Sequence, residues 1–152
     1  MNAAPMIAQT IQLALAPVFV LVAIGNIMGI LTTRLGRAVD RSRLLQTLHG
    51  TTSDAQHDNV VRDIRTIDRR IQLIGHALLA LVLSGLATGI TVGALFLSEI
   101  SGVEFRNLTA ATFLIAVSLL MLALVYLLKE TRLALRAFRL PPELLELHRT
   151  DI

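Results

Sequence analysis

The chain has 152 residues, of which 54% are hydrophobic and 16% charged, and its mean hydropathy is +0.67. Soluble domains carry about 25% charged residues, so this composition excludes an ordinary water-soluble enzyme and indicates a membrane protein. The formal net charge of +3 does not indicate nucleic-acid binding, because the basic residues directly adjoin long apolar runs. The absence of cysteine excludes disulfide bonds, thiolate catalysis and cysteine-ligated metal.

The first predicted element is a transmembrane helix over residues 6–33. Residues 1–33 contain no Asp, Glu, Lys, Arg or His, and a helix needs about 20 apolar residues to cross the hydrocarbon core. The apolar run is longer than the roughly 7 to 15 residues of a signal-peptide core, so we expect it to be retained. Pro17 is the expected position of a kink.

Charge begins abruptly at Arg34, and residues 34–70 are expected to form an antiparallel helical hairpin that extends the first two spans. Gly50 is the expected helix stop, and Ser53 or Thr52 is the expected N-cap of the next helix. The second helix is expected from about Ser53 to Leu97, because its apolar residues alternate at spacings of three and four, typical of a coiled-coil seam. These residues are Val60, Ile64, Ile67, Ile71, Ile74, Leu78 and Leu81.

The two arms of the hairpin carry complementary charges if Arg34 and Arg70 lie at the same depth. This register places Arg41 opposite Asp63 and predicts two further pairs, each contributing about 0 to 1 kcal/mol if exposed. The alternative is a solvated face without specific pairs. The further pairs are Arg37 with Asp68 and Asp40 with Arg65.

Two more spans follow, at residues 71–97 and 108–128, joined by a loop at 98–107 and followed by a tail at 129–152. Residues 34–70 hold eight Lys or Arg, the loop at 98–107 holds one, and the tail holds five. Because basic loops stay in the cytoplasm, we expect the N-terminus outside, the loop at 98–107 in the periplasm and the C-terminus inside a bacterial inner membrane. The predicted fold class is all-α and integral membrane, with three transmembrane helices and a cytoplasmic hairpin.

Glycines recur on one face of the second span and favour close helix packing. Small residues let helix backbones approach where lipid provides no hydrophobic drive to association. We expect contact between the first two spans, and the alternative is contact between protomers. The glycines are Gly25 and Gly29 in the first span, and Gly85, Gly89 and Gly93 in the second.

The first span also carries a polar stripe that includes Gln12 and Asn26. Amides in hydrocarbon are unfavourable without partners, so both side chains are expected to face protein or water. Hydrogen bonding between helices is the preferred interpretation, and the wall of an oligomeric pore is the alternative.

Few residues in the sequence suggest metal binding, pH sensing or catalysis. His49, Asp54, His57 and Asp58 gather at the predicted hairpin tip, but exposed tips of this composition are common, so we predict no metal site. His76, near the start of the second span, is expected to hydrogen-bond a neighbouring carbonyl rather than to sense pH. With no phosphate loop, matched nucleophile and base, or close carboxylate pair within the membrane, we predict no enzyme activity and no cofactor.

The basic residues that flank the spans are expected to contact anionic lipid headgroups. A short helix over residues 142–148, with Pro142 in its first turn, is expected along the membrane surface or against the hairpin. The headgroup-contacting residues are Arg34, Arg70, Lys129, Arg132 and Arg136.

The segments APVF at residues 16–19, LTTRLGRAVDRSR at 31–43 and RRIQLI at 69–74, together with Gly25, resemble a known family. It is the bacterial membrane family called domain of unknown function 2721, and the likeness covers about residues 7–98. The arginine-aspartate-arginine block is its most specific part. The resemblance implies a small bacterial inner-membrane protein, without catalytic residues or a cofactor to carry over.

Two functional hypotheses follow. The leading one is a non-enzymatic protein that acts in assembly, as a homo-oligomer or as an accessory subunit of a larger membrane complex. The other is a small homo-oligomeric ion channel whose first span lines the pore.

Overall fold

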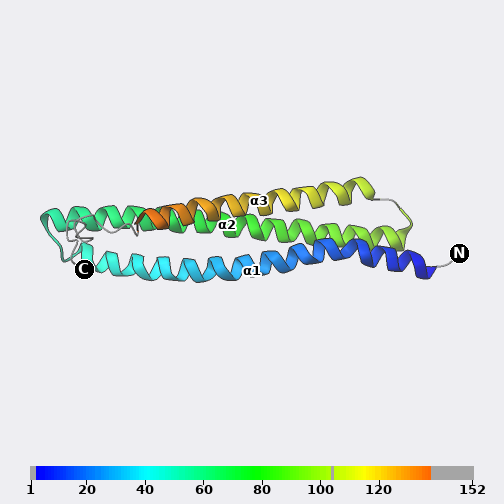
Figure 1. Ribbon diagram of the computed structural model, residues 1–152, viewed down its shortest axis with the longest axis horizontal. Coiled ribbons are helices and arrows are strands. Elements are labelled where there is room, and N and C mark those ends of the chain that lie inside the picture. Colours follow the sequence, from blue (N-terminus) through cyan, green and yellow to red (C-terminus); the bar gives the residue numbers. More distant parts are fainter. Residues whose placement is uncertain (1–2, 104, 138–152) are drawn as a thin grey trace, which may run out of the picture.

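The protein forms three long antiparallel α-helices in a computed structural model that describes residues 3–103 and 105–137 (Figure 1). They are α1 (Ala3–His49), α2 (Asp54–Ser101) and α3 (Arg106–Ala137). At 1.5 Å per residue α1 and α2 are each about 70 Å long, more than twice the ~30 Å thickness of a hydrocarbon core. All three helices are long and apolar enough to cross a membrane. The all-α class and the three helices are thus confirmed.

The helix ends follow local hydrogen bonding. After α1, the backbone N–H groups of Thr51 and Thr52 donate to the Leu48 carbonyl at 3.0 and 3.1 Å, and the chain reverses direction within four residues. α2 ends at Gly102, whose φ of 69° lies in the left-handed region that glycine adopts without strain. The Gly102 N–H donates to the Ser98 carbonyl at 3.1 Å. Pro17 lies within α1, and the helix continues through it without a break.

α2 packs along both other helices, whereas α1 and α3 have little direct contact. On α1, every seventh residue is buried from Pro17 through Ile24, Leu31 and Ala38 to Leu45. These residues face the coiled-coil row of α2, in which Ile67, Ile74 and Leu81 are buried and Ile64, Ile71 and Leu78 are partly buried. The period of seven keeps the two rows in register along the α1–α2 contact.

The contact between α2 and α3 uses small and hydroxyl-bearing side chains. Ser84 is fully buried, and its Oγ donates a hydrogen bond to the Ala116 carbonyl oxygen at 2.7 Å. Near the other end of the contact, the Thr91 and Thr112 hydroxyls lie 2.9 Å apart. Short side chains allow the two backbones to approach, and each hydroxyl finds an acceptor away from water.

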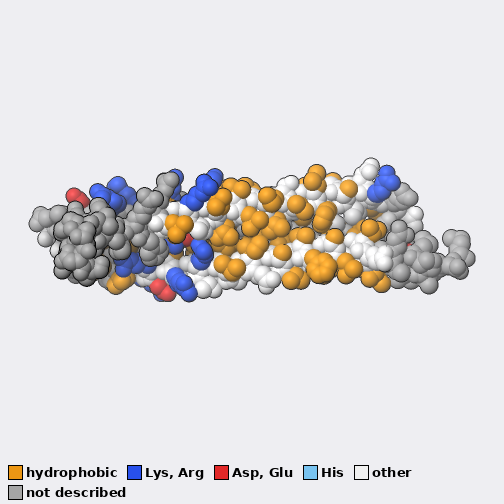
Figure 2. All heavy atoms as spheres, viewed as in Figure 1, with side chains coloured by type: hydrophobic (Ala, Val, Ile, Leu, Met, Phe, Trp, Pro, Cys, Tyr) orange, Lys and Arg blue, Asp and Glu red, His pale blue; other side chains and the backbone are white. Residues whose placement is uncertain are grey.

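The surface of the bundle is apolar along its middle and basic toward one end. Large apolar side chains such as Phe19, Leu86 and Leu114 are exposed, and Figure 2 shows apolar side chains along the middle of the molecule. Most of the visible Lys and Arg side chains gather toward the end that contains the α1–α2 turn. An apolar surface of this extent is unfavourable in water and indicates contact with lipid or protein.

Candidate functional site

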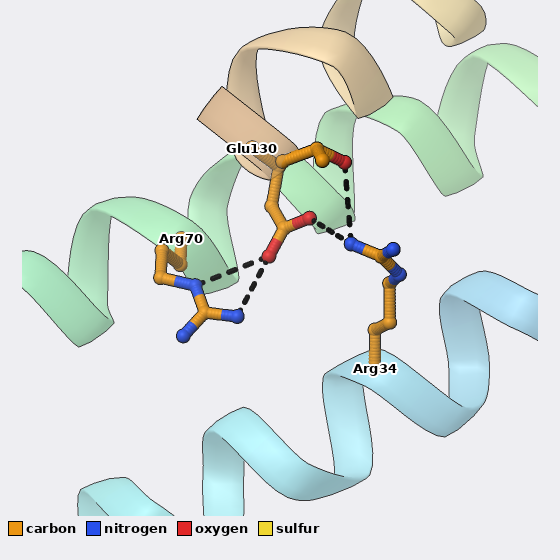
Figure 3. A network of polar contacts seen from close by, with 4 residues as sticks. Arg34, Arg70 and Glu130 are labelled. Carbon is orange, nitrogen blue, oxygen red and sulfur yellow. Dashed lines mark hydrogen bonds and ion pairs between the residues drawn. The ribbon is translucent and has the colours of Figure 1, made fainter. Parts of the chain in front are cut away.

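Glu130 joins the three helices at an ionic junction. Its carboxylate, on α3, is fully buried and points between α1 and α2 (Figure 3). From α1, the Arg34 Nη1 donates to Oε2 at 2.8 Å and to the Thr131 hydroxyl at 3.2 Å. From α2, the Arg70 Nε and Nη2 both donate to Oε1, at 3.1 and 2.9 Å.

The position of Glu130 follows from the period of α3. Ala116, Ala123 and Glu130 are seven residues apart and lie on one buried face of the helix. At the first two positions this face meets Ser84 and the apolar core, and at the third it lies where α1 and α2 present arginines. A buried carboxylate is costly unless it is paired and hydrogen-bonded, and two guanidinium groups meet this requirement here.

Glu130 was not among the residues predicted from the sequence, and Arg34 and Arg70 were expected to contact lipid headgroups. In the structure both guanidinium groups bind Glu130, although the Arg34 side chain remains 37% exposed. The seven-residue spacing of Ala116, Ala123 and Glu130 along α3 is the sequence signal that could have identified Glu130.

The other residues expected to contact headgroups lie on α3. Lys129 and Arg132 are exposed, and the Lys129 Nζ lies 5.7 Å from the centre of the Tyr126 ring. The side chain of Arg136 and the segment 142–148 lie outside the described residues.

A cleft of about 630 Å³ adjoins the junction on its side toward the α1–α2 turn. Four guanidinium groups line it, from Arg34, Arg37, Arg41 and Arg70, together with the carboxylate of Asp63. Its remaining walls are largely apolar, and we call it the basic cleft. Positive charge between largely apolar walls suits an anionic group attached to an apolar body.

The hairpin register brings together one of the expected charge pairs. The Arg41 Nη2 lies 3.8 Å from the Asp63 Oδ2, and both side chains are more than half exposed. Among the described residues no ion pair forms between Arg37 and Asp68 or between Asp40 and Arg65. Asp68 instead accepts a hydrogen bond from the Gln72 amide at 2.8 Å.

The face of α1 that points away from α2 carries polar side chains without partners. Asn26 follows the buried Ile24 by two residues, which at about 100° per residue places it on the opposite side of the helix. Gln12 is also exposed, and neither amide forms a hydrogen bond within the described part of the chain. Gly29, three residues after Asn26, is exposed as well. We call Gln12, Asn26 and Gly29 the open face of α1.

The glycines do not mediate the expected contact between the first two spans. A Cβ atom added at any of them would meet no neighbouring atom within 4 Å. Within this chain α1 meets α2 through Ile24, Leu31 and Ile74 rather than through glycine, because the buried seven-residue rows hold the glycines outside the seam. The positions concerned are Gly25, Gly29, Gly85, Gly89 and Gly93.

Three histidines lie within the described residues, and each has a neighbouring ring. At the hairpin tip the rings of His49 and His57 lie 4.5 Å apart, but the described residues contain no group of three or more side chains that could hold a metal ion. The His76 Nδ1 lies 2.7 Å from the Gln72 carbonyl oxygen, as expected, and its ring stacks on Tyr126 at 5.5 Å.

Comparison with known proteins gives one match. A family model described as "Protein of unknown function (DUF2721)" matches residues 14–140. The match includes α3 and therefore extends beyond the residues 7–98 that carry the resemblance in the sequence. Neither the curated proteins nor the solved structures give a match.

Proposed function

The chain belongs to the DUF2721 family, and we propose that it is a non-enzymatic, multi-pass membrane protein that acts in assembly. It assembles either with copies of itself or as an accessory subunit of a larger membrane complex. The observation that carries this proposal is the open face of α1, where the amides of Gln12 and Asn26 have no partner within the described chain.

The energetics of the open face favour a second helix. An amide transferred into hydrocarbon without a hydrogen bond costs about 2 to 7 kcal/mol, and at this depth lipid offers it no partner. A helix seated on the face supplies acceptors for Asn26, and Gly29 allows its backbone to come close. Contacts of this kind contribute about 0.6 to 2 kcal/mol for each hydrogen bond between helices.

The ionic junction supports this role by holding α1 in place. α1 has little contact with α3 apart from the pairing of Arg34 with Glu130. With α1 held at the junction and along its seam with α2, the open face is presented on a fixed support. Less ordering entropy is then lost when a partner helix binds.

We place the protein in the bacterial inner membrane with its N-terminus outside and with the hairpin and C-terminus in the cytoplasm. The basic end of the bundle, which contains Arg34, Arg37, Arg41 and Arg70, then lies at the cytoplasmic surface, in agreement with the retention of Lys and Arg on that side.

Cross-linking from single cysteines tests the proposal, because the natural chain contains none. Asn26→Cys carries a benzophenone maleimide and is irradiated in native membranes. The matched control is Leu79→Cys, on an exposed part of α2 at a similar level, since Arg34 and Arg70 fix the register of the two helices.

We expect the label at position 26 to give a product at a multiple of the 16.6 kDa chain mass, or a discrete larger product with another subunit. The label at position 79 should give much less of either. Equal yields from the two positions, or lipid adducts alone, would contradict assembly through α1.

A channel is the second candidate, because the same exposed amides would suit the wall of a pore formed by several copies of α1. Ion flux into liposomes that contain the full chain separates the two functions. Flux that changes with Asn26→Leu supports the channel, and an absence of flux from the cross-linked oligomer excludes it.

A further inference from the structure

Among the residues that the structure describes, the basic cleft has more arginines than carboxylates. Within this described part, the four lining arginines are matched by two carboxylates, those of Asp63 and the adjoining Glu130, which leaves two positive charges over. Arg37 forms no ion pair or hydrogen bond within the described residues, and the 3.8 Å separation of Arg41 from Asp63 exceeds a hydrogen-bond distance.

These charges are crowded on one side of α1. Arg34, Arg37 and Arg41 follow one another at spacings of three and four, which brings side chains together on a helix surface. Like charges at these spacings repel each other and destabilise the helix unless a counter-anion lies among them. The arrangement therefore favours an anion within reach of Arg37 and Arg41.

The depth of the cleft matches the headgroup layer of a bilayer. No charged residue precedes Arg34, so Arg34 marks the point at which α1 leaves the apolar region. Arg37 lies about 4.5 Å further along the helix axis, and the headgroup layer is roughly 5 to 7 Å thick. Arg37 thus reaches the level of lipid phosphates. Arg41 lies about 10.5 Å beyond Arg34, just outside this layer, and its long side chain reaches back toward the phosphates.

The walls of the cleft fit a ligand with an apolar body. Leu135, an exposed residue of α3, lines it together with the arginines, whereas the side chains of Ala38, Leu45 and Ile67 at its base are buried between the helices. A free phosphate or another small ion gains nothing from Leu135, whereas a phospholipid covers this side chain with its glycerol region.

We propose that the basic cleft binds an anionic phospholipid of the cytoplasmic leaflet that carries two negative charges, with its phosphate groups held by Arg37, Arg41 and the exposed part of Arg34. The two uncompensated charges select a doubly charged lipid over a singly charged one. This site is independent of the open face of α1 and does not depend on the assembly function.

Native mass spectrometry of the full chain in detergent tests the proposal through titration with tetraoleoyl cardiolipin or dioleoylphosphatidylglycerol. We expect the first cardiolipin to bind roughly fivefold or more tightly than phosphatidylglycerol, since it engages one additional arginine. The double variant Arg37→Gln/Arg41→Gln should weaken cardiolipin binding roughly 30-fold.

The matched control is Arg62→Gln/Arg69→Gln, which removes the same charge from exposed positions of α2 outside the cleft. Equal weakening in the control, or the absence of any preference for cardiolipin, would overturn the proposal. Displacement of cardiolipin by millimolar inorganic phosphate would also overturn it, because the cleft would then be a site for a free anion.

A charge-retaining variant distinguishes lost binding from lost folding. Arg37→Lys/Arg41→Lys should bind cardiolipin more tightly than the glutamine variant and less tightly than the natural chain, because lysine keeps the charge without the bidentate geometry. If both double variants bind as the natural chain does, the arginines do not hold the lipid and the proposal fails.

Discussion

Replacing Glu130 by glutamine should release α1 from α3 while leaving the size of the side chain almost unchanged. The substitution removes the negative charge that holds Arg34 and Arg70 at the junction. Both guanidinium groups then remain beside a neutral amide, and Arg70, whose side chain is only 17% exposed, is largely cut off from water.

The size of the effect follows from the exposure of the two arginines. Breaking the pair between the buried Glu130 and Arg70 costs about 3 to 5 kcal/mol, because an uncompensated charge stays buried. Arg34 is 37% exposed, so its share is screened and adds at most about 1 kcal/mol. The new amide still accepts one hydrogen bond, which recovers about 1 kcal/mol. We therefore expect the free energy of unfolding to fall by about 2 to 5 kcal/mol.

The assay follows the separation of α1 and α3 by energy transfer between dyes at Ile30→Cys and Leu128→Cys, both exposed positions near the junction. Unfolding is induced with dodecyl sulfate in mixed micelles, with unlabelled chain in excess. Asp58→Asn is the control, since it makes the same chemical change at an exposed residue without an ion pair among the described residues.

A loss below about 1 kcal/mol for Glu130→Gln would refute the junction as a buried contact. The double variant Glu130→Gln/Arg70→Gln should recover part of the loss, because it no longer leaves a charge buried. A double variant that loses the sum of the two single losses would mean that Glu130 and Arg70 do not interact.

Three smaller effects follow from other contacts. Ser84→Ala removes the hydrogen bond to the Ala116 carbonyl and should lower the free energy of unfolding by about 0.6 to 1.7 kcal/mol in the same micelle titration. Gly102→Ala places a side chain at φ 69° and should cost about 1 to 2 kcal/mol, seen as a lower melting temperature by circular dichroism. Arg41→Gln should change the free energy of unfolding by less than about 1 kcal/mol, because its pair with Asp63 is exposed; a larger loss would show that the pair holds the hairpin together.

The helices were predictable from the sequence because their signals are local. Long uncharged runs, the stop at Gly50 and the coiled-coil row of α2 all depend on neighbouring residues, and the structure contains α2 from Asp54 to Ser101 where about Ser53 to Leu97 was expected. Of the three charge pairs predicted from the hairpin register, Arg41 with Asp63 is present, and the other two do not form among the described residues.

The junction and the glycine faces depend on three helices at once, so they were harder to predict. Glu130 follows an apolar run and, by composition alone, resembles an ordinary surface residue; its burial depends on where α3 meets the arginines of α1 and α2. Gly25 and Gly89 have the spacing of packing residues, but spacing does not say which face of a helix meets which neighbour. The contact between α1 and α2 is instead formed by larger buried side chains that recur every seven residues on each helix.

The most direct test of assembly is native mass spectrometry of the protein released from its own membrane vesicles without detergent exchange. Assembly through α1 predicts masses of two or more 16.6 kDa chains, or of the chain with a further subunit, which fall to the single chain in Asn26→Leu. A single 16.6 kDa chain, carrying lipid but no protein, would contradict it.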